Sequence, residues 1–283
     1  MITLADKFEE YAGTKEYHGI VAVIQRWFYG EMIRASWCAT SVSYFAELLG
    51  ILGQLGGKNE NVYEMMMDCR QANAETGRGL FLYRRDIPRG AVLKRGCVIF
   101  MLNDGSVMTA GSNKHVTSSG ASVVYIGSGA FIGIGGNQSD AIMPKTYSQQ
   151  KIYAVFYPVY GKDPRDFVAD LYAGALGRTG EAAGAAWWKK GLTVQTLTGI
   201  RAAQDFYLGQ EYASRRRTDP EFLVDLYHGL LGREPDKGGY DYWLGRMAGG
   251  RMERKDVLKG FCVSAEFLNR CNSFEISRGT WTE

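Results

Sequence analysis

The sequence predicts an α+β domain followed by an all-α domain, and two observations carry this prediction. The first 160 residues begin with helical patterns and change, from Gly96 onward, to short β-branched and aromatic segments punctuated by Gly, Asn and Ser. The last third of the chain repeats itself with a helical pattern only. The length of 283 residues agrees, because about 150 residues make an ordinary domain.

The N-terminal domain is expected to open with helices and continue as an antiparallel sheet. Residues 38–52 have the apolar spacing of one helix, and residues 60–75 predict another. Six later segments predict strands: GCVIFML, SVMTAG, HVTSSG, ASVVYIG, FIGIGG and KIYAVFYPVY. The domain boundary is expected between Tyr160 and Asp163, which gives domains of residues 1–160 and 163–283.

The C-terminal domain is expected to contain two helical repeats, at about residues 163–212 and 219–271. Residues 167–188 and 222–243 are identical at ten positions when offset by 55. The offset then grows to 61, where Phe206 matches Phe267, so we expect a small insertion in the second copy near residues 248–254.

Each repeat carries its own helix start and stop signals. Asp-Pro pairs at residues 163–164 and 219–220 predict helix starts, because Pro is tolerated in the first turn. Gly177 and Gly232 stand where the apolar pattern ends, the usual place for a residue with positive φ. The recurring Leu, Tyr and Trp positions favour core packing over a ligand cage.

Composition excludes several function classes. A net charge of +3 with 22% charged residues gives no support to nucleic-acid binding. The sequence has no apolar window of about 18 residues, so no membrane span is expected. The N-terminus lacks a basic segment followed by an apolar one, which predicts synthesis in the host cytoplasm without a signal peptide. Five cysteines without CxxC or Cys/His spacing predict reduced thiols, no metal site and no cofactor.

Cys38 is the candidate nucleophile. It follows Trp37 and opens an apolar-periodic helix, where the helix dipole and unpaired N–H groups favour the thiolate. The same N–H groups can donate to a developing oxyanion. On composition alone a buried, inert cysteine is commoner, and Cys69, Cys97, Cys262 and Cys271 are assigned to that class.

A thiol nucleophile needs a base, and the chain has three histidines. His115 begins a predicted strand, whereas His18 lies in an early segment and His228 has Ala173 as its counterpart in the other repeat. Asn137, in the segment Gly-Gly-Asn-Gln after a predicted strand, can orient the second ring nitrogen of the histidine. Cysteine with a distant His and Asn is a recognised nucleophilic arrangement.

These residues carry a family resemblance. The segment RASWCATSVSYFAELLG resembles the nucleophile helix of CHAP-type peptidoglycan hydrolases, a papain-like group, and GGNQSD at residues 135–140 resembles a later motif of phage and prophage endolysins. The likeness covers about residues 5–158. Many CHAP enzymes have Glu or Asp two residues before the Asn, where this chain has Gly135, and the acidic calcium loop of some relatives is not evident.

The resemblance implies a papain-like fold and an endolysin that cleaves an amide bond of bacterial peptidoglycan. It implies Cys38 as nucleophile, His115 as base and Asn137 as the polar third member, with Trp37 and Gln138 beside the substrate. Three alternatives stay open: an antibacterial or virion-associated effector with the same chemistry, a non-enzymatic wall-binding protein, and a papain-like enzyme acting on protein.

The repeats resemble a bacterial domain of unknown function found in secreted and surface proteins. The resemblance rests on LYxxxLGR, on a following GxxxW or GxxYW, and on SAEF at residues 264–267, which we align with residues 203–206 of the first copy. It implies anchoring to a wall or envelope glycan. A helical bundle that only supports the catalytic domain is the other interpretation.

Overall fold

The structure, a computed structural model, describes residues 1–33, 35–105, 107–120 and 123–282. The chain divides into two compact units, Met1–Tyr160 and Gly161–Glu283, and each is described by itself. The first has N-terminal helices and an antiparallel sheet, and the second is helical, so the α+β class is confirmed. The papain-like fold stays a prediction. None of the described helices has the length and apolar character needed to cross a membrane.

The first unit begins with helices and ends with strands. Its helices are α1 (Leu4–Glu10), α2 (Gly19–Tyr29), α3 (Cys38–Leu48) and α4 (Val62–Thr76), with 3₁₀ turns η1 (Leu52–Leu55), η2 (Arg84–Asp86) and η3 (Gln149–Lys151). Its strands are β1 (Leu80–Tyr83), β2 (Val92–Lys94), β3 (Val98–Leu102), β4 (Lys114–Ser119), β5 (Val123–Tyr125), β6 (Ala130–Gly135), β7 (Met143–Ser148) and β8 (Ile152–Tyr157).

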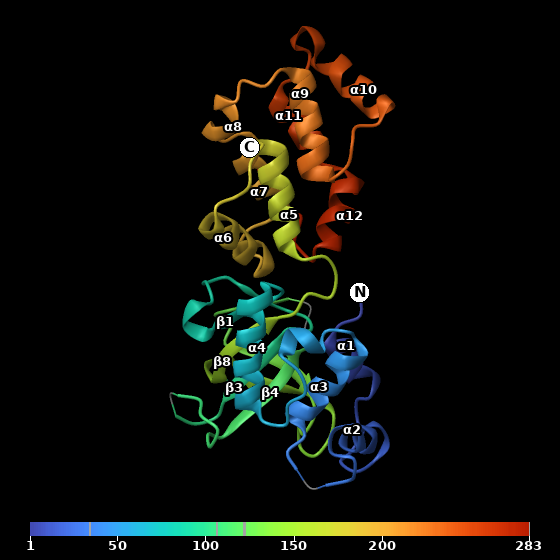
Figure 1. The fold of residues 1–283 in the computed structure, drawn as a ribbon, viewed down its shortest axis with the longest axis vertical. Helices are drawn as coiled ribbons and strands as arrows, with labels where there is room; N and C mark the ends of the chain where they lie inside the picture. Colours follow the sequence, from blue (N-terminus) through green and yellow to red (C-terminus); the bar gives the residue numbers. More distant parts are fainter. Residues whose placement is uncertain (34, 106, 121–122, 283) are drawn as a thin grey trace. The chain divides into compact units, whose positions relative to one another are not determined.

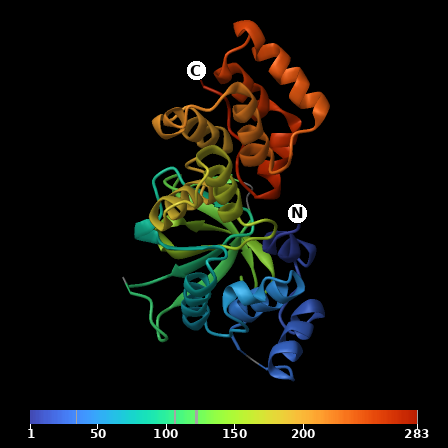
Figure 2. The ribbon, with the colours of Figure 1, turned by 45° about the horizontal axis from the view of Figure 1, so that its top comes forward.

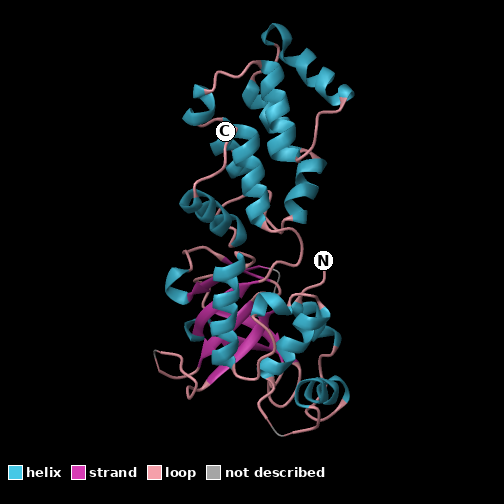
Figure 3. Cartoon of the chain, in the orientation of Figure 1, coloured by secondary structure: helices cyan, strands magenta, loops and turns pink. Residues whose placement is uncertain are grey.

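Six of these strands form one antiparallel sheet in the order β1-β8-β3-β4-β6-β7, shown in magenta in Figure 3. Strands β2 and β5 pair separately. Helices α3 and α4 cover one face of the sheet in both views (Figures 1 and 2). Phe45 of α3 and Phe100 and Phe156 of the sheet are fully buried in the core between them.

Several sequence predictions for this unit need correction. The helix expected over residues 38–52 ends at Leu48, because the chain reverses through Gly50 at φ 67°, a left-handed conformation. Of the expected strand SVMTAG, residues 107–111 form a loop, and Ser106 lies outside the described residues. Strands β1, β2 and β7 were not predicted.

The second unit consists of two copies of the same helical arrangement. The first contains α5 (Pro164–Leu171), α6 (Ala182–Thr193), α7 (Gly199–Tyr207) and α8 (Gln210–Ser214), and the second contains α9 (Asp219–Leu226), α10 (Lys237–Met247), α11 (Arg254–Val263) and α12 (Ala265–Ser273). The π-helical turns η4 (Tyr172–Leu176) and η5 (Tyr227–Leu231) extend α5 and α9, and the 3₁₀ turn η6 (Ala248–Gly250) follows α10. Gly177 and Gly232 both take φ 65°, which confirms the predicted stops.

The two copies correspond at a constant offset of 55, so the predicted insertion near residues 248–254 is wrong. The ring of Tyr172 meets Phe206 edge-to-face at 4.9 Å, and Tyr227 meets Phe261 in the same way at 5.0 Å. The counterpart of Phe206 is therefore Phe261, not Phe267. By the same offset, SAEF at residues 264–267 corresponds to residues 209–212, which read GQEY.

Ion pairs repeat with the same offset. The Arg178 guanidinium donates to Glu211 at 2.6 and 3.0 Å, and the Arg233 guanidinium donates to Glu266 at the same two distances. Two further arginines, Arg215 and its counterpart Arg270, each donate to carbonyls at the end of the π-turn of their own copy. These arginine contacts therefore recur in both copies.

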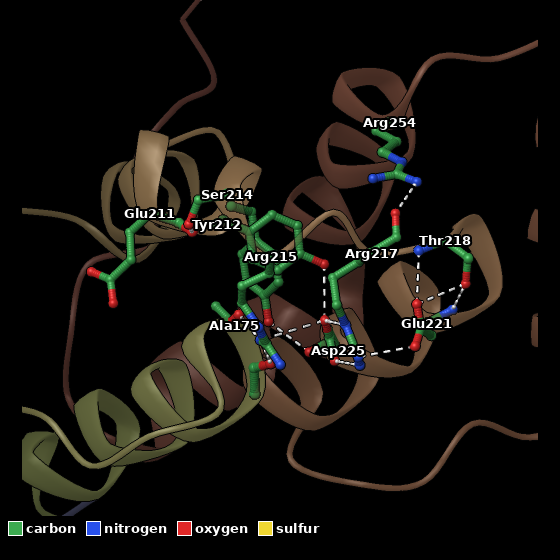
Figure 4. A network of polar contacts seen from close by, with 12 residues as sticks. Ala175, Glu211, Tyr212, Ser214, Arg215, Arg217, Thr218, Glu221, Asp225 and Arg254 are labelled. Atoms are coloured by element: carbon green, nitrogen blue, oxygen red, sulfur yellow. Dashed lines mark hydrogen bonds and ion pairs between the residues drawn. The ribbon is translucent and has the colours of Figure 1, made fainter.

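The first helices of the two copies cross where both have glycine. A Cβ atom at Gly174 would lie 2.5 Å from the backbone nitrogen of Gly229, a separation that real Cβ atoms do not show. An arginine of each copy also contacts an aspartate of the other copy. Arg270 pairs with Asp170 of the first copy, and Arg215 lies 3.7 Å from Asp225 of the second (Figure 4).

Gly174→Ala is expected to destabilise the second unit by about 2–3 kcal/mol, because the methyl group would force the two backbones apart. Gly245→Ala in α10 is the matched control. Its Cβ would meet no atom within 4 Å, so the better helix propensity should stabilise the unit by up to ~1 kcal/mol. Urea unfolding of the full chain by circular dichroism measures both, and equal effects would contradict the close crossing.

Candidate active site

Cys38 is the first residue of α3, as predicted. Trp37 is the N-cap and makes no side-chain capping hydrogen bond, so the first N–H groups of the helix have no side-chain cap at this position. The Ser41 hydroxyl donates to the Cys38 carbonyl at 2.8 Å and fixes the first turn. The Cys38 side chain is buried with 4% exposure.

The electrostatic environment of the thiol differs from the sequence prediction. Burial raises the pKa of the Cys38 thiol above its ordinary value, and this effect outweighs all the others. The backbone N–H groups of Val116 and Ala39 and the charge of Lys114 lower the pKa in part. Cys38 is therefore a thiol at neutral pH, and the predicted thiolate is not stabilised in the resting protein, because desolvation exceeds the helix-terminus effect.

His115 lies on β4, directly before the residue whose N–H group reaches the thiol. Its Nε2 is buried and has no hydrogen-bond partner within the described part of the chain. Burial, with a smaller effect of the Lys145 charge, lowers the pKa of His115 to about 4. The imidazole is therefore neutral at pH 7, and its ring centroid lies 6.0 Å from that of Tyr147.

Asn137 follows β6 in a left-handed conformation with φ 57°. Strands β4 and β6 pair Ser118 with Ile134 and Ser119 with Gly133. His115 precedes Ser118 by three residues and Asn137 follows Ile134 by three, so both lie beyond the paired residues at the same end of these strands. The sheet thus brings His115 and Asn137 to one end of the same strand pair.

The chain between β6 and Asn137 packs tightly on the start of α3. A Cβ atom at Gly136 would lie 2.4 Å from the Ser41 hydroxyl and 2.6 Å from the Trp37 ring, so only glycine fits there. Trp37 is fully buried. The Trp37 ring therefore supports the loop that carries Asn137, and its place beside the substrate stays a prediction.

Gln138 is also turned into the protein, with 2% exposure. In the amide orientation that satisfies its neighbours, its oxygen accepts from the Gly135 N–H at 2.9 Å and its nitrogen donates to the Tyr147 hydroxyl at 3.2 Å. These bonds tie the loop to β7. The side chain borders the depression described next, but its polar groups are engaged by the protein, and its role as a substrate contact stays a prediction.

A polar depression of about 340 Å³ lies beside His115 and Asn137. The charged side chains that line it are Lys114, Lys145 and Lys151, and Cys38 is not among the described residues that line it. The structure therefore brings His115 and Asn137 to one depression, while the thiol lies against the backbone of the residue after His115.

Tyr147 is the residue that the sequence analysis missed. Burial and the charge of a Cys38 thiolate raise the pKa of Tyr147 to about 12, so its hydroxyl stays protonated at neutral pH, and its ring lies near that of His115. It lies on β7, whose sequence MPKTYS has no apolar alternation and gives no strand signal. Within the described residues, no group of three or more His, Cys, Asp or Glu side chains is arranged to hold a metal ion.

One comparison with known proteins gives a match. A family model described as Domain of unknown function (DUF4214) matches residues 203–271. This supports the resemblance of the repeats to a domain of unknown function. No CHAP or hydrolase family model matches the chain. No curated protein and no solved structure matches it either.

Proposed function

We propose that residues 1–160 form a cysteine-dependent peptidoglycan amidase or endopeptidase with Cys38 as nucleophile and His115 as base. The observation that carries the proposal is the position of the thiol at the start of α3, where it faces the backbone N–H of Val116, the residue next to His115. The family resemblance of the nucleophile helix and of GGNQSD supplies the substrate class.

The chemistry proceeds through an acyl-enzyme. His115 accepts the thiol proton while the sulfur attacks the amide carbonyl, and the imidazolium then protonates the leaving amine. The N–H groups of Val116 and Ala39 can donate to the oxyanion that develops at the carbonyl. Water then attacks the thioester with His115 again as base, and the thiol is restored.

Asn137 is proposed to orient the second ring nitrogen of His115, and the support for this is that both residues line one depression. The second unit is proposed to hold the enzyme at the wall through a glycan. The test of the whole proposal is the release of new amino groups and the loss of turbidity when the full chain acts on purified peptidoglycan, and the new termini identify the bond.

A non-enzymatic wall-binding protein is the second candidate. Two observations favour it: burial raises the pKa of the Cys38 thiol, and Cys38 does not line the described depression beside His115. In that case the chain would sediment with the wall without releasing amines.

The pH profile of hydrolysis is expected to have an unusual acidic limb. His115 acts as a base only when it is neutral, and its pKa is about 4, so kcat/KM should fall only as the pH drops toward about 4. Lys145→Gln removes a positive charge that disfavours the imidazolium. It should therefore raise the pKa of His115 and move the acidic limb to higher pH.

Lys151→Gln provides the matched control for the pH profile, because Lys151 lines the same depression but does not shift the pKa of His115. Its acidic limb should coincide with that of the unaltered protein. An acidic limb near pH 6.5 in the unaltered protein, the ordinary value for histidine, would contradict His115 as the buried base.

A further inference from the structure

A second and larger cavity in the first unit has no role in the proposed chemistry. Its volume is about 770 Å³, and its charged lining residues are all cationic: Arg70 from α4, Arg84 and Arg85 from η2, and Lys151 from η3. No Asp or Glu is found among the described residues that line it. Four positive charges around one cavity create a potential that attracts anions.

These cations are largely unpaired. Within the described part of the chain, the side chains of Arg70 and Arg84 take part in no hydrogen bond or ion pair. Arg85 lies 3.9 Å from Asp86, and its side chain is 81% exposed, which makes that pair weak. Lys151 donates to the Asn103 amide oxygen at 3.2 Å. Two guanidinium groups therefore keep their full hydrogen-bonding capacity for a ligand.

The apolar part of the lining limits the kind of anion. Three buried aliphatic side chains contribute to it: Ile87, Leu102 and Ile152. Tyr83 and Tyr153 stand perpendicular to each other with ring centroids 5.9 Å apart. Two guanidinium groups already lie near the Tyr83 ring, at 5.4 and 5.9 Å from its centroid.

We infer that this cavity binds an acidic peptide segment through its carboxylates. A guanidinium group matches a carboxylate with two parallel hydrogen bonds, and the aliphatic surface suits the methylene groups of peptide side chains. Nucleic acid fits less well. Single strands are held by aromatic faces on which bases stack, and here the tyrosines are perpendicular and one already has cations near its ring.

Lys151 connects this cavity to the candidate active site, because it lines both the cavity and the depression beside His115. An acidic peptide held by Arg70 and Arg84 can therefore continue toward His115. The cavity is a binding site separate from the proposed chemistry, so a binding measurement tests it whether or not the chain is a hydrolase.

Isothermal titration calorimetry tests it with the full-length Cys38→Ala variant, which separates binding from hydrolysis. The probes are tetraglutamate and tetraglutamine, both acetylated and amidated. Tetraglutamate is expected to bind at least about tenfold more tightly than tetraglutamine, because each lost charge-assisted pair costs about that factor. The double variant Arg70→Gln/Arg84→Gln should lose at least about tenfold in affinity for tetraglutamate.

Arg89→Gln is the matched control, because Arg89 is an exposed arginine of the same unit that does not line the cavity. It should bind tetraglutamate as the parent does. Arg84→Lys keeps the positive charge but loses the two parallel hydrogen bonds of the guanidinium group. Its affinity for tetraglutamate should lie between those of the parent and the double variant. The inference is overturned if the two peptides bind equally, if Arg89→Gln weakens binding as much as the double variant, or if only an oligothymidylate binds. Thermal unfolding verifies that each variant is folded. If the double variant is not folded, Lys151→Gln replaces it as the variant that removes a charge from the cavity.

Discussion

Cys38→Ala is expected to reduce the rate of amine release from purified peptidoglycan by about 10⁴-fold or more. The remaining rate would come from substrate binding without a nucleophile. The change removes the only atom that can form the acyl-enzyme in the proposed mechanism, and neither His115 nor Asn137 can replace a thiol at that point. Binding to the wall should persist, because the variant leaves the second unit unaltered.

The control must be an equally buried thiol outside the site. Cys97 has 2% exposure, and burial raises the pKa of its thiol to about 12. Cys97→Ala is therefore expected to lose stability in the same way as Cys38→Ala while it keeps its activity. Urea unfolding of both variants separates a folding defect from a chemical one.

Three outcomes discriminate between the candidates. If the parent releases amines and Cys38→Ala does not, the thiol is the nucleophile. If Cys38→Ala keeps full activity, the assignment of the nucleophile is wrong. If neither protein releases amines although both are folded and sediment with the wall, the non-enzymatic wall-binding function is favoured.

Apolar periodicity predicted those elements that bury one face. The helix start at Cys38 and strands β3, β4, β6 and β8 fall on segments whose side chains pack in the core. Strand β7 was missed because most of its side chains are exposed, so its membership in the sheet depends on backbone pairing with β6 rather than on burial.

The repeat offset shows a different limit. Both copies consist of short amphipathic helices, so a shift of a few residues still aligns apolar positions with apolar positions. Phe206 and Phe267 were matched for this reason. The ring contacts of Phe206 and Phe261 decide the alignment, and they depend on Tyr172 and Tyr227, which are distant in sequence.

The sequence could propose candidate site residues, but it could not predict their electrostatics. Residue types and spacing indicated Cys38, His115 and Asn137, and the last two line one depression. Burial depends on the whole fold. It raises the pKa of Cys38 and lowers that of His115, so both groups are neutral at pH 7, whereas a helix terminus alone predicts a thiolate.

Asp225→Ala is expected to destabilise the second unit by about 3–5 kcal/mol, because it removes the buried anion from two partly buried arginines and leaves Arg217 only the more exposed Glu221. Asp225 has 5% exposure. Its carboxylate accepts two hydrogen bonds from the Arg217 guanidinium, both at 2.8 Å, and one from the Tyr212 hydroxyl at 2.9 Å, while Arg215 lies 3.7 Å away (Figure 4). Both arginines would then be partly buried without this partner.

The other copy supplies the matched variant. Asp170 is the counterpart of Asp225, but its side chain is 44% exposed and its ion pair is with Arg270. The counterpart of Tyr212 is Phe267, which has no hydroxyl to donate. Asp170→Ala should therefore cost only about 1 kcal/mol, as expected for a half-exposed pair.

Tyr212→Phe reproduces the environment of Asp170 around Asp225 and should cost about 1–2 kcal/mol, because it removes one hydrogen bond to a buried carboxylate. Urea unfolding of the three variants gives the order Asp225→Ala, Tyr212→Phe, Asp170→Ala in decreasing loss. Equal losses for the two aspartate variants would show that the buried network does not contribute more than the exposed pair. The stability of the unit would then have to come from the helix crossing at Gly174 and the paired aromatic cores of the two copies.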